Sequence, residues 1–178
     1  MKITETSLKE CFVIEPDIFE DERGFFLETY NKEKYKQINN FPDIFLQDNH
    51  SQSIKNTLRG LHLQLRKPQG KLVRVVAGEV FDVVVDLRID SDTFGCWHAE
   101  YLNEHNKKQL WVPPGFAHGF LVISDKADFE YKCSELYHPE DELCIIWNDP
   151  TIKIDWPIDN PILSDKDSNG LELRDVKF

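Results

Sequence analysis

KLVRVVAGEVFDVVVDL, residues 71–87, contains two valine-rich runs on either side of a glycine. Valine is β-branched and enriched in strands. In a strand, Asp82 and Asp86 share one face of the second run with Val80 and Val84, while the opposite face is entirely apolar. We therefore predict two strands, Lys71–Ala77 and Val80–Leu87. The dipeptide Gly78-Glu79 between them is typical of a tight turn, so we expect the two strands to form a hairpin.

Similar short apolar runs continue along the chain, separated by turn-forming residues. We expect further strands at Trp97–Leu102, Gln109–Val112, Phe120–Ile123, Asp128–Ser134 and Cys144–Trp147. The helical signal is limited to Asn31–Asn39, which Asn31 can cap, and to a weaker polar stretch at Ser164–Asn169. Many short strands with regular turns indicate an all-β sandwich or small barrel, of which the jelly roll is one form. No linker or repeat interrupts residues 1–178, so we expect a single domain.

The composition narrows the class of partner. The chain has 178 residues and a net charge of -11. This balance argues against nucleic acid and anionic membranes, which both need a basic face, but a small anionic ligand needs only a local cluster of arginine and lysine. We find no apolar run of about 20 residues and no signal peptide. The four cysteines lack the close spacing of zinc or redox motifs. We therefore expect a cytoplasmic protein with free thiols.

Two segments carry histidines in notable positions. In Arg59–Gln64, RGLHLQ, the side chains of His62 and Gln64 share one face of a strand. They line a cavity if the strand faces inward, and form a surface row if it lies at an edge. In Pro113–Phe120, PPGFAHGF, a forced turn precedes His118 at the start of an apolar strand, where a buried core histidine is the plainer interpretation.

The spacing from Pro113 to His118 resembles the second motif of the cupin superfamily. The first cupin motif is incomplete, because Gln64 occupies the next inward position after His62. Two imidazoles without a close-spaced partner and a carboxylate make a poor site for a divalent metal. The resemblance therefore implies a cupin-type jelly roll (a double-stranded β-helix) with a few short helices, and neither a catalytic metal nor another cofactor.

Eight motifs, two of them already described, occur in order along the chain. They are Asp21–Phe26 (DERGFF), Gln47–Ser51 (QDNHS), Arg59–Gln64 (RGLHLQ), Gln69–Arg74 (QGKLVR), Gly78–Val83 (GEVFDV), Pro114–Phe120 (PGFAHGF), Trp147–Pro150 (WNDP) and Leu163–Asp167 (LSDKD). Together they resemble the dTDP-4-dehydrorhamnose 3,5-epimerase family over nearly the whole chain. The resemblance implies conversion of dTDP-4-dehydro-6-deoxy-D-glucose to dTDP-4-dehydro-L-rhamnose in dTDP-L-rhamnose biosynthesis.

The chemistry of this conversion sets what the residues must do. The C4 ketone acidifies the hydrogens on C3 and C5, so inversion needs a base, an acid on the opposite face and a group that holds the enolate oxygen. The resemblance implies that His62 is the base and that Asp167 orients it. It implies that Tyr131 is the acid and that Lys71 is the cation beside the enolate.

The resemblance also implies a set of substrate-binding residues. Arg23 and Arg59 match positions that contact the diphosphate, and guanidinium groups suit phosphate oxygens. Phe26 offers a face to the thymine ring. The remaining positions, which match contacts with the base and sugars, are Glu28, Gln47, Asn49, His118, Tyr137, Glu142 and Lys166. The family works as a dimer, so we expect a homodimer in which Arg23 or Phe26 reaches across the interface.

Other functions remain open at this point. An epimerase that acts at one carbon, or on another nucleotide sugar, can keep the same base and acid, although Tyr137 and the Arg23–Phe26 block favour the 3,5-epimerase. A 3,4-ketoisomerase uses the same fold, but Tyr131 together with the His62–Asp167 pair argues against it. A cupin that only binds sugar predicts loss of one of the four catalytic positions. A cupin oxygenase predicts a stoichiometric metal.

Overall fold

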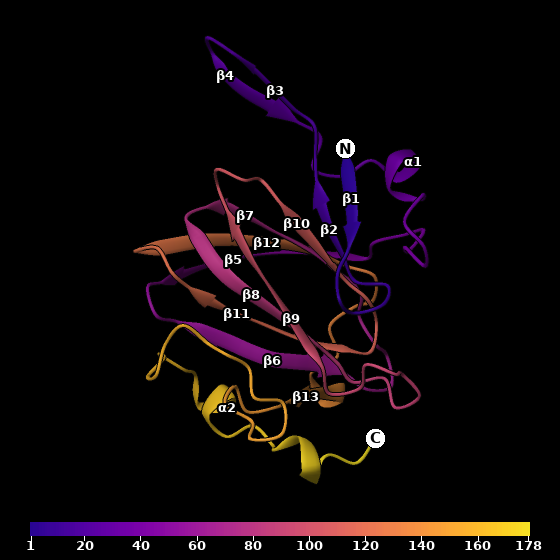
Figure 1. Cartoon of the computed structure of the whole chain (residues 1–178), viewed down its shortest axis with the longest axis vertical. Helices are drawn as coiled ribbons and strands as arrows, with labels where there is room; N and C mark the ends of the chain where they lie inside the picture. Colours follow the sequence, from indigo (N-terminus) through magenta and orange to yellow (C-terminus); the bar gives the residue numbers. More distant parts are fainter.

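The computed structural model describes residues 1–178 and shows two antiparallel sheets, with a small hairpin projecting from one end (Figure 1). The first sheet contains, in spatial order, β1 (Lys2–Glu5), β2 (Phe12–Glu15), β10 (Gln109–Val112), β7 (Lys71–Ala77), β12 (Lys126–Cys133) and β5 (Gln47–Ile54). The second contains β13 (Glu142–Cys144), β6 (Leu58–Gln64), β11 (Phe116–Val122), β8 (Glu79–Asp86) and β9 (Trp97–Asn103). The projecting hairpin consists of β3 (Ile18–Asp21) and β4 (Gly24–Leu27). The expected all-β, cupin-type jelly roll is confirmed.

The helices are few and short, as expected. They are α1 (Lys32–Tyr35), α2 (Asp165–Ser168) and two 3-10 turns at Pro139–Asp141 and Leu173–Asp175. Asn31 caps α1 as predicted, because its side-chain oxygen accepts hydrogen bonds from the backbone N–H groups of Glu33 and Lys34. The predicted extension of this helix to Asn39 is wrong, since only one turn forms.

The hairpin predicted around Gly78 is also wrong, although both of its strands exist. β7 pairs with β10 and β12 in the first sheet, whereas β8 pairs with β9 and β11 in the second. Gly78, with φ of +80°, turns the chain from one sheet to the other, and a Cβ there would lie 2.2 Å from the carbonyl oxygen of Lys126. A tight glycine turn therefore marks a corner between sheets as readily as a hairpin.

The remaining predicted strands are present with shifted ends. β10 has the predicted bounds, and β9 and β12 differ by one or two residues at their ends. β11 begins at Phe116 instead of Phe120, because the strand resumes directly after the turn at Pro113-Pro114-Gly115. His118 therefore lies within the strand, opposite His62 of β6, and not at its start. The strand predicted at Cys144–Trp147 is displaced to Glu142–Cys144.

Three apolar clusters hold the layers together. One joins the facing sides of the two sheets through residues such as Val73, Val84 and Phe129. A second covers the outer face of the five-stranded sheet with the C-terminal segment, including Trp156. The third packs Tyr35 and neighbouring aromatic side chains onto the six-stranded sheet. Each fully buried large apolar side chain contributes about 1.5–3 kcal/mol, so these clusters fix both walls of the space between the sheets. No helix of the chain is both long enough and apolar enough to span a membrane.

Candidate active site

A cavity of about 350 Å³ opens between the two sheets. The six-stranded sheet contributes Gln47, Asn49, Ser51, Lys71, Phe129 and Tyr131, and the five-stranded sheet contributes Arg59, His62, His118, Phe120 and Glu142. Helix α2 contributes Lys166, and the connecting segments contribute Gln69 and Tyr137. Because side chains alternate along a strand, every second residue of β5 faces this space. The volume falls within the range of small-molecule sites, which span about 300–1,000 Å³.

His62 on the five-stranded sheet forms a short hydrogen bond with Asp167 of α2. The His62 Nε2 and Asp167 Oδ1 atoms lie 2.6 Å apart, and the Ser164 hydroxyl donates to Asp167 Oδ2 at 2.7 Å. Burial alone would raise the pKa of Asp167, but the hydrogen bonds from His62 and Ser164 outweigh it and hold the pKa below its usual value. Asp167 is therefore a carboxylate, His62 donates through Nε2, and the other ring nitrogen is left to accept a proton.

Lys71 and Tyr131 lie on the opposite wall, on neighbouring strands of the six-stranded sheet. Lys71 forms no hydrogen bond or ion pair through its side chain, and burial lowers the pKa of its ammonium group. Burial raises the pKa of Tyr131 to about 12, so its phenol stays protonated at neutral pH. The cavity therefore offers an unpaired cation and a protonated hydroxyl opposite the His62–Asp167 pair.

Glu142 lines the cavity and binds two of the other lining residues. Its Oε2 atom accepts hydrogen bonds from the Tyr137 hydroxyl at 3.0 Å and from Lys166 Nζ at 2.8 Å. Burial would raise the pKa of Glu142, but Lys166 and His62 lower it. Its Oε1 atom lies 3.9 Å from Nδ1 of His62, where a carboxylate stabilises a protonated imidazole.

His118 has its own buried carboxylate. Its Nε2 atom lies 2.9 Å from Oδ1 of Asp82, which is fully buried in β8. Burial raises the pKa of Asp82, while His118 opposes this shift. His118 also stacks near Phe129, so it forms a rigid part of the cavity wall.

Only some of the residues predicted to bind the diphosphate and the base lie at the cavity of their own chain. Arg59 lines the cavity, and its Nε donates to Ser53 at 2.9 Å, which leaves the terminal guanidinium nitrogens free. Arg23 and Phe26 lie in the projecting β3–β4 hairpin and line a separate surface hollow. Glu28 is bound to Lys34 and Asn31 beside α1, away from the cavity. Three predicted binding residues are therefore not brought to the site by their own chain.

Of the two residues that would share a cavity face on an inward-facing strand, His62 lines the cavity and Gln64 does not. Its side chain is buried and binds the backbone of the neighbouring connections, donating to the Lys67 carbonyl at 2.7 Å and accepting from His138 N–H at 2.8 Å. Conversely, the sequence reasoning missed four lining residues, which are Ser51, Gln69, Phe120 and Phe129. Ser51 is notable, because its buried hydroxyl has no hydrogen-bond partner. The alternation from Gln47 through Asn49 to Ser51 would have indicated it.

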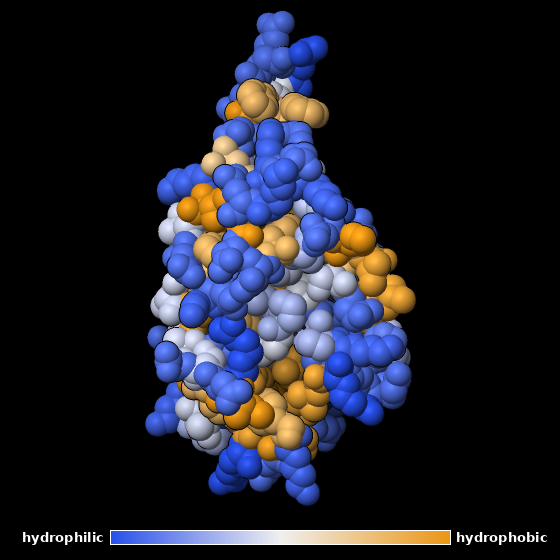
Figure 2. All heavy atoms as spheres, turned by 90° about the vertical axis from the view of Figure 1, so that its right-hand side faces the viewer, coloured by the Kyte–Doolittle hydropathy of each residue, from blue (hydrophilic) through white to orange (hydrophobic).

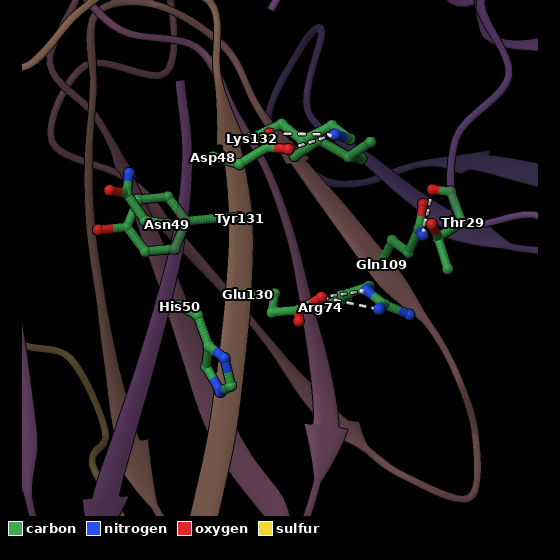
Figure 3. A pocket seen from close by; sticks show the side chains of 10 residues that line it. Thr29, Asp48, Asn49, His50, Arg74, Gln109, Glu130, Tyr131 and Lys132 are labelled. Carbon is green, nitrogen blue, oxygen red and sulfur yellow. Dashed lines mark hydrogen bonds and ion pairs between the residues drawn. The ribbon is translucent and has the colours of Figure 1, made fainter. Parts of the chain in front are cut away.

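A second hollow of about 340 Å³ lies on the same sheet and shares Asn49 and Tyr131 with the cavity (Figure 3). Its charged side chains are already paired, since Arg74 contacts Glu130 at 2.7 Å and Lys132 contacts Asp48 at 2.9 Å (Figure 3). Only the inner cavity combines a histidine–carboxylate pair with an unpaired cation, so we assign the chemistry there.

The residues around His62 do not form the metal site typical of cupins. His62 and His118 lie opposite each other on paired strands, but each is hydrogen-bonded to a different carboxylate. The one cluster of metal-type donors consists of His62, Cys144 and Asp167, without His118. The absence of a metal cofactor stays a prediction. Fold and cavity together define a cupin-type jelly roll whose cavity holds a histidine–carboxylate pair opposite an unpaired lysine and a protonated tyrosine.

Known proteins resemble the chain over nearly its full length. The sequence model of dTDP-4-dehydrorhamnose 3,5-epimerase matches residues 5–175, and the chain belongs to this family. It is 52% identical over 177 residues to the dTDP-4-dehydrorhamnose 3,5-epimerase of Pseudomonas aeruginosa, covering 99% of this chain and 98% of that protein.

Solved structures agree with this assignment. A dTDP-6-deoxy-D-glucose-3,5-epimerase from Legionella pneumophila, in complex with dTDP-4-keto-L-rhamnose, is 49% identical with a TM-score of 0.96, over 99% of this chain and 94% of that chain. A 3'-monoepimerase from Streptomyces bikiniensis in complex with dTDP-quinovose is 34% identical with a TM-score of 0.88, over 95% and 86% of the two chains. The fold is thus shared by enzymes that act at two positions and at one.

Proposed function

We propose that the chain is a 3,5-epimerase that converts dTDP-4-dehydro-6-deoxy-D-glucose to dTDP-4-dehydro-L-rhamnose, in dTDP-L-rhamnose biosynthesis. One observation carries the proposal: the histidine base and the tyrosine acid come from opposite walls of one cavity. Inversion of a carbon requires removal of a proton from one face and delivery to the other.

The proposed cycle runs through an enolate. His62 accepts the proton from C3 or C5, and the resulting imidazolium is stabilised by Asp167 at 2.6 Å and by Glu142 at 3.9 Å. The charge that develops on the C4 oxygen is stabilised by the ammonium of Lys71. Tyr131 then donates its proton to the opposite face of the carbon. Exchange with solvent returns the proton from His62 and reprotonates Tyr131, so each inversion introduces one solvent hydrogen.

Substrate binding in this proposal needs a second copy of the chain. The β3–β4 hairpin pairs with no other strand, and a lone two-stranded hairpin is marginally stable in water. Phe19, Phe25 and Phe26 on it are 61%, 56% and 66% exposed, and Figure 2 shows the hairpin as a narrow projection with apolar side chains on its surface. Exposed apolar patches of this kind mark interaction sites. We propose a symmetric dimer in which each hairpin brings Arg23 and Phe26 to the partner's cavity. There they would bind the substrate together with Arg59, which contacts the diphosphate in this proposal.

The reaction is tested by proton NMR of the keto sugar nucleotide in deuterium oxide, with a chelator present. Loss of both the C3 and C5 signals is expected. Loss of only one signal would identify a single-site epimerase, and loss of neither, with folded protein, would refute the proposal. The variant His62→Asn should abolish exchange at both carbons while it retains dTDP binding, and retained exchange would show that the base is another residue.

The exchange of hairpins is tested by mixing two variants. We choose a substrate concentration at which Arg23→Ala and His62→Asn are each inactive. Random reassortment of the subunits should then restore about a quarter of the wild-type activity. Half of the dimers contain one subunit of each variant, and each of these mixed dimers has one intact site out of its two. If each hairpin served its own cavity, no mixture would regain activity. A monomeric mass by light scattering would also contradict the proposal.

A further inference from the structure

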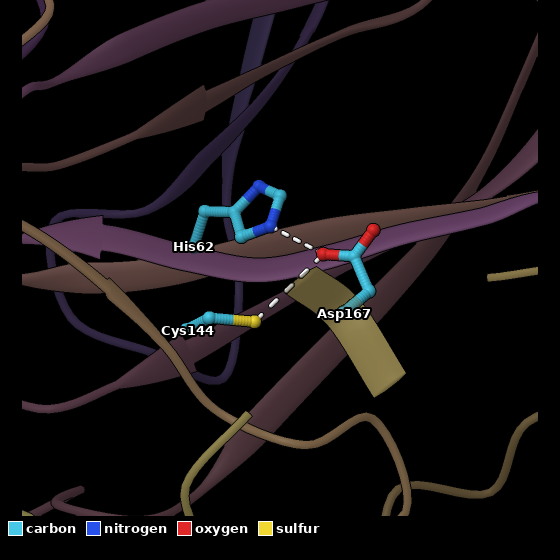
Figure 4. A group of neighbouring side chains, drawn as sticks. All are labelled: His62, Cys144 and Asp167. Carbon is cyan, nitrogen blue, oxygen red and sulfur yellow. Dashed lines mark hydrogen bonds and ion pairs between the residues drawn. The ribbon is translucent and has the colours of Figure 1, made fainter. Parts of the chain in front are cut away.

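Cys144 lies directly beside the His62–Asp167 pair. It is the residue of β13 that pairs with His62 of β6, and its Sγ atom lies 3.7 Å from Oδ1 of Asp167. Figure 4 shows the three side chains pointing toward one another, and one donor atom from each lies within 4.8 Å of the other two. The cluster thus offers one nitrogen, one sulfur and one oxygen.

We infer that His62, Cys144 and Asp167 form an inhibitory binding site for a zinc-type divalent cation. Zinc prefers tetrahedral nitrogen and sulfur ligands, with oxygen also accepted, and sites with three protein ligands leave the fourth position to water. One thiolate and one carboxylate offset the two positive charges of the ion. Binding releases the thiol proton of Cys144 to solvent.

The spacing of the donors supports a tetrahedral site. Bond lengths of about 2.3 Å to sulfur and about 2.0 Å to nitrogen or oxygen place sulfur and oxygen ligands about 3.5 Å apart at the tetrahedral angle. The observed distance from Cys144 Sγ to Asp167 Oδ1 is 3.7 Å. Nitrogen and oxygen ligands would lie about 3.3 Å apart, whereas His62 Nε2 and Asp167 Oδ1 are 2.6 Å apart. The ion can therefore bind once these two atoms move slightly further apart.

The movement of the His62 and Asp167 side chains away from each other would explain the inhibition. A bound cation takes both atoms of the His62–Asp167 hydrogen bond as ligands, so the bond cannot persist and the imidazole turns toward the metal. An ion can enter from the cavity, which His62 lines and where Glu142 adds negative charge 3.9 Å from the ring. The inhibitory effect rests on the proposed function of His62, whereas the binding of the ion does not.

The test separates binding from inhibition. Untagged wild-type protein is titrated with Cd²⁺, and the thiolate-to-cadmium charge-transfer band is recorded in the ultraviolet. The affinity for Zn²⁺ is then measured by competition with a chromophoric chelator. Inhibition by Zn²⁺ is measured in the NMR assay, with the activity of each protein normalised to its own activity without metal. The variants are Cys144→Ala, Cys144→Ser and, as a matched control, Cys96→Ser, which changes an exposed cysteine.

We expect wild type and Cys96→Ser to show the cadmium band, stoichiometric zinc and inhibition that a chelator reverses. Both Cys144 variants should lose the band and need at least about tenfold more zinc for inhibition, since even the loss of a residue that only supports a metal ligand typically weakens metal affinity about 10- to 100-fold. A cadmium band or unchanged zinc sensitivity in a folded Cys144 variant would overturn the inference. If the keto sugar were not a substrate, the cadmium and chelator titrations would still decide whether the site exists.

Discussion

Replacement of Lys71 by methionine would isolate the charge proposed to stabilise the enolate. The two side chains are similar in length and unbranched, and only lysine is charged. Lys71 has no internal ion pair, so its ammonium is free to interact with the substrate. At about 4 Å and an effective dielectric constant of about 20, this interaction amounts to about 4 kcal/mol. Oxyanion donors contribute about 2.7–4 kcal/mol, so we expect kcat to fall by about 10²- to 10³-fold.

The same substitution should stabilise the fold. Burial lowers the pKa of Lys71 below its ordinary value, so the unfolded chain holds this proton more tightly than the folded chain. Below the folded-state pKa the buried charge carries its full penalty, and the penalty fades as the pH rises toward the unfolded value of about 10.4. The excess stability of Lys71→Met should therefore be largest near neutral pH and shrink at alkaline pH.

The measurements are deuterium exchange by NMR for kcat and thermal unfolding between neutral and alkaline pH for stability. Lys126→Met is a suitable control, because Lys126 is exposed on the same sheet and should change neither quantity appreciably. An unchanged kcat in Lys71→Met would refute the role in enolate stabilisation. A lower melting temperature together with lower kcat would show that Lys71 acts through structure instead.

Three further predictions concern the two carboxylates Asp167 and Asp86 and the proposed acid Tyr131. Asp167→Asn removes the charge behind the 2.6 Å bond to His62, and because hydrogen bonds to charged groups contribute about 1.5–3 kcal/mol, exchange at both carbons should slow about 10- to 150-fold by NMR. Tyr131→Phe should allow proton loss but slow net inversion, and since the pKa of Tyr131 is about 12, its ionisation should not limit kcat below about pH 11; equal loss of exchange and inversion would make this residue structural. Burial would raise the pKa of Asp86, but hydrogen bonds from Arg88 and two loop hydroxyls hold it at about 2. Asp86→Asn should therefore cost about 2 kcal/mol in urea unfolding at pH 7, with the difference shrinking as the pH falls from about 4 toward 2; a difference independent of pH would contradict this origin.

The catalytic candidates were accessible from sequence to different degrees. His62 and Lys71 lie in short motifs whose family resemblance implied their roles, and both line the cavity. The contact between His62 and Asp167 spans 105 residues, so no local pattern predicts it. Cys144 was interpreted only as one of several free thiols, because its place beside this pair depends on the pairing of β13 with β6.

The amino-acid sequence by itself determined that the protein is built from short strands. The β-branched composition of a strand is a local property, and both Lys71–Ala77 and the run after Gly78 are rich in valine. Local capping likewise marked the start of α1 at Asn31. These features need no information from distant parts of the chain.

Only the tertiary structure decided which strands pair and which side chains meet. β8 is buried along most of its length, so its place in the second sheet depends on the cover that β11, β9 and the C-terminal segment supply together. Gly78 permits either a hairpin or a corner, and the choice between them is made by the burial of both strands. The same holds for Arg23, because only the structure shows that its hairpin pairs with no other strand of the chain and lies apart from the cavity.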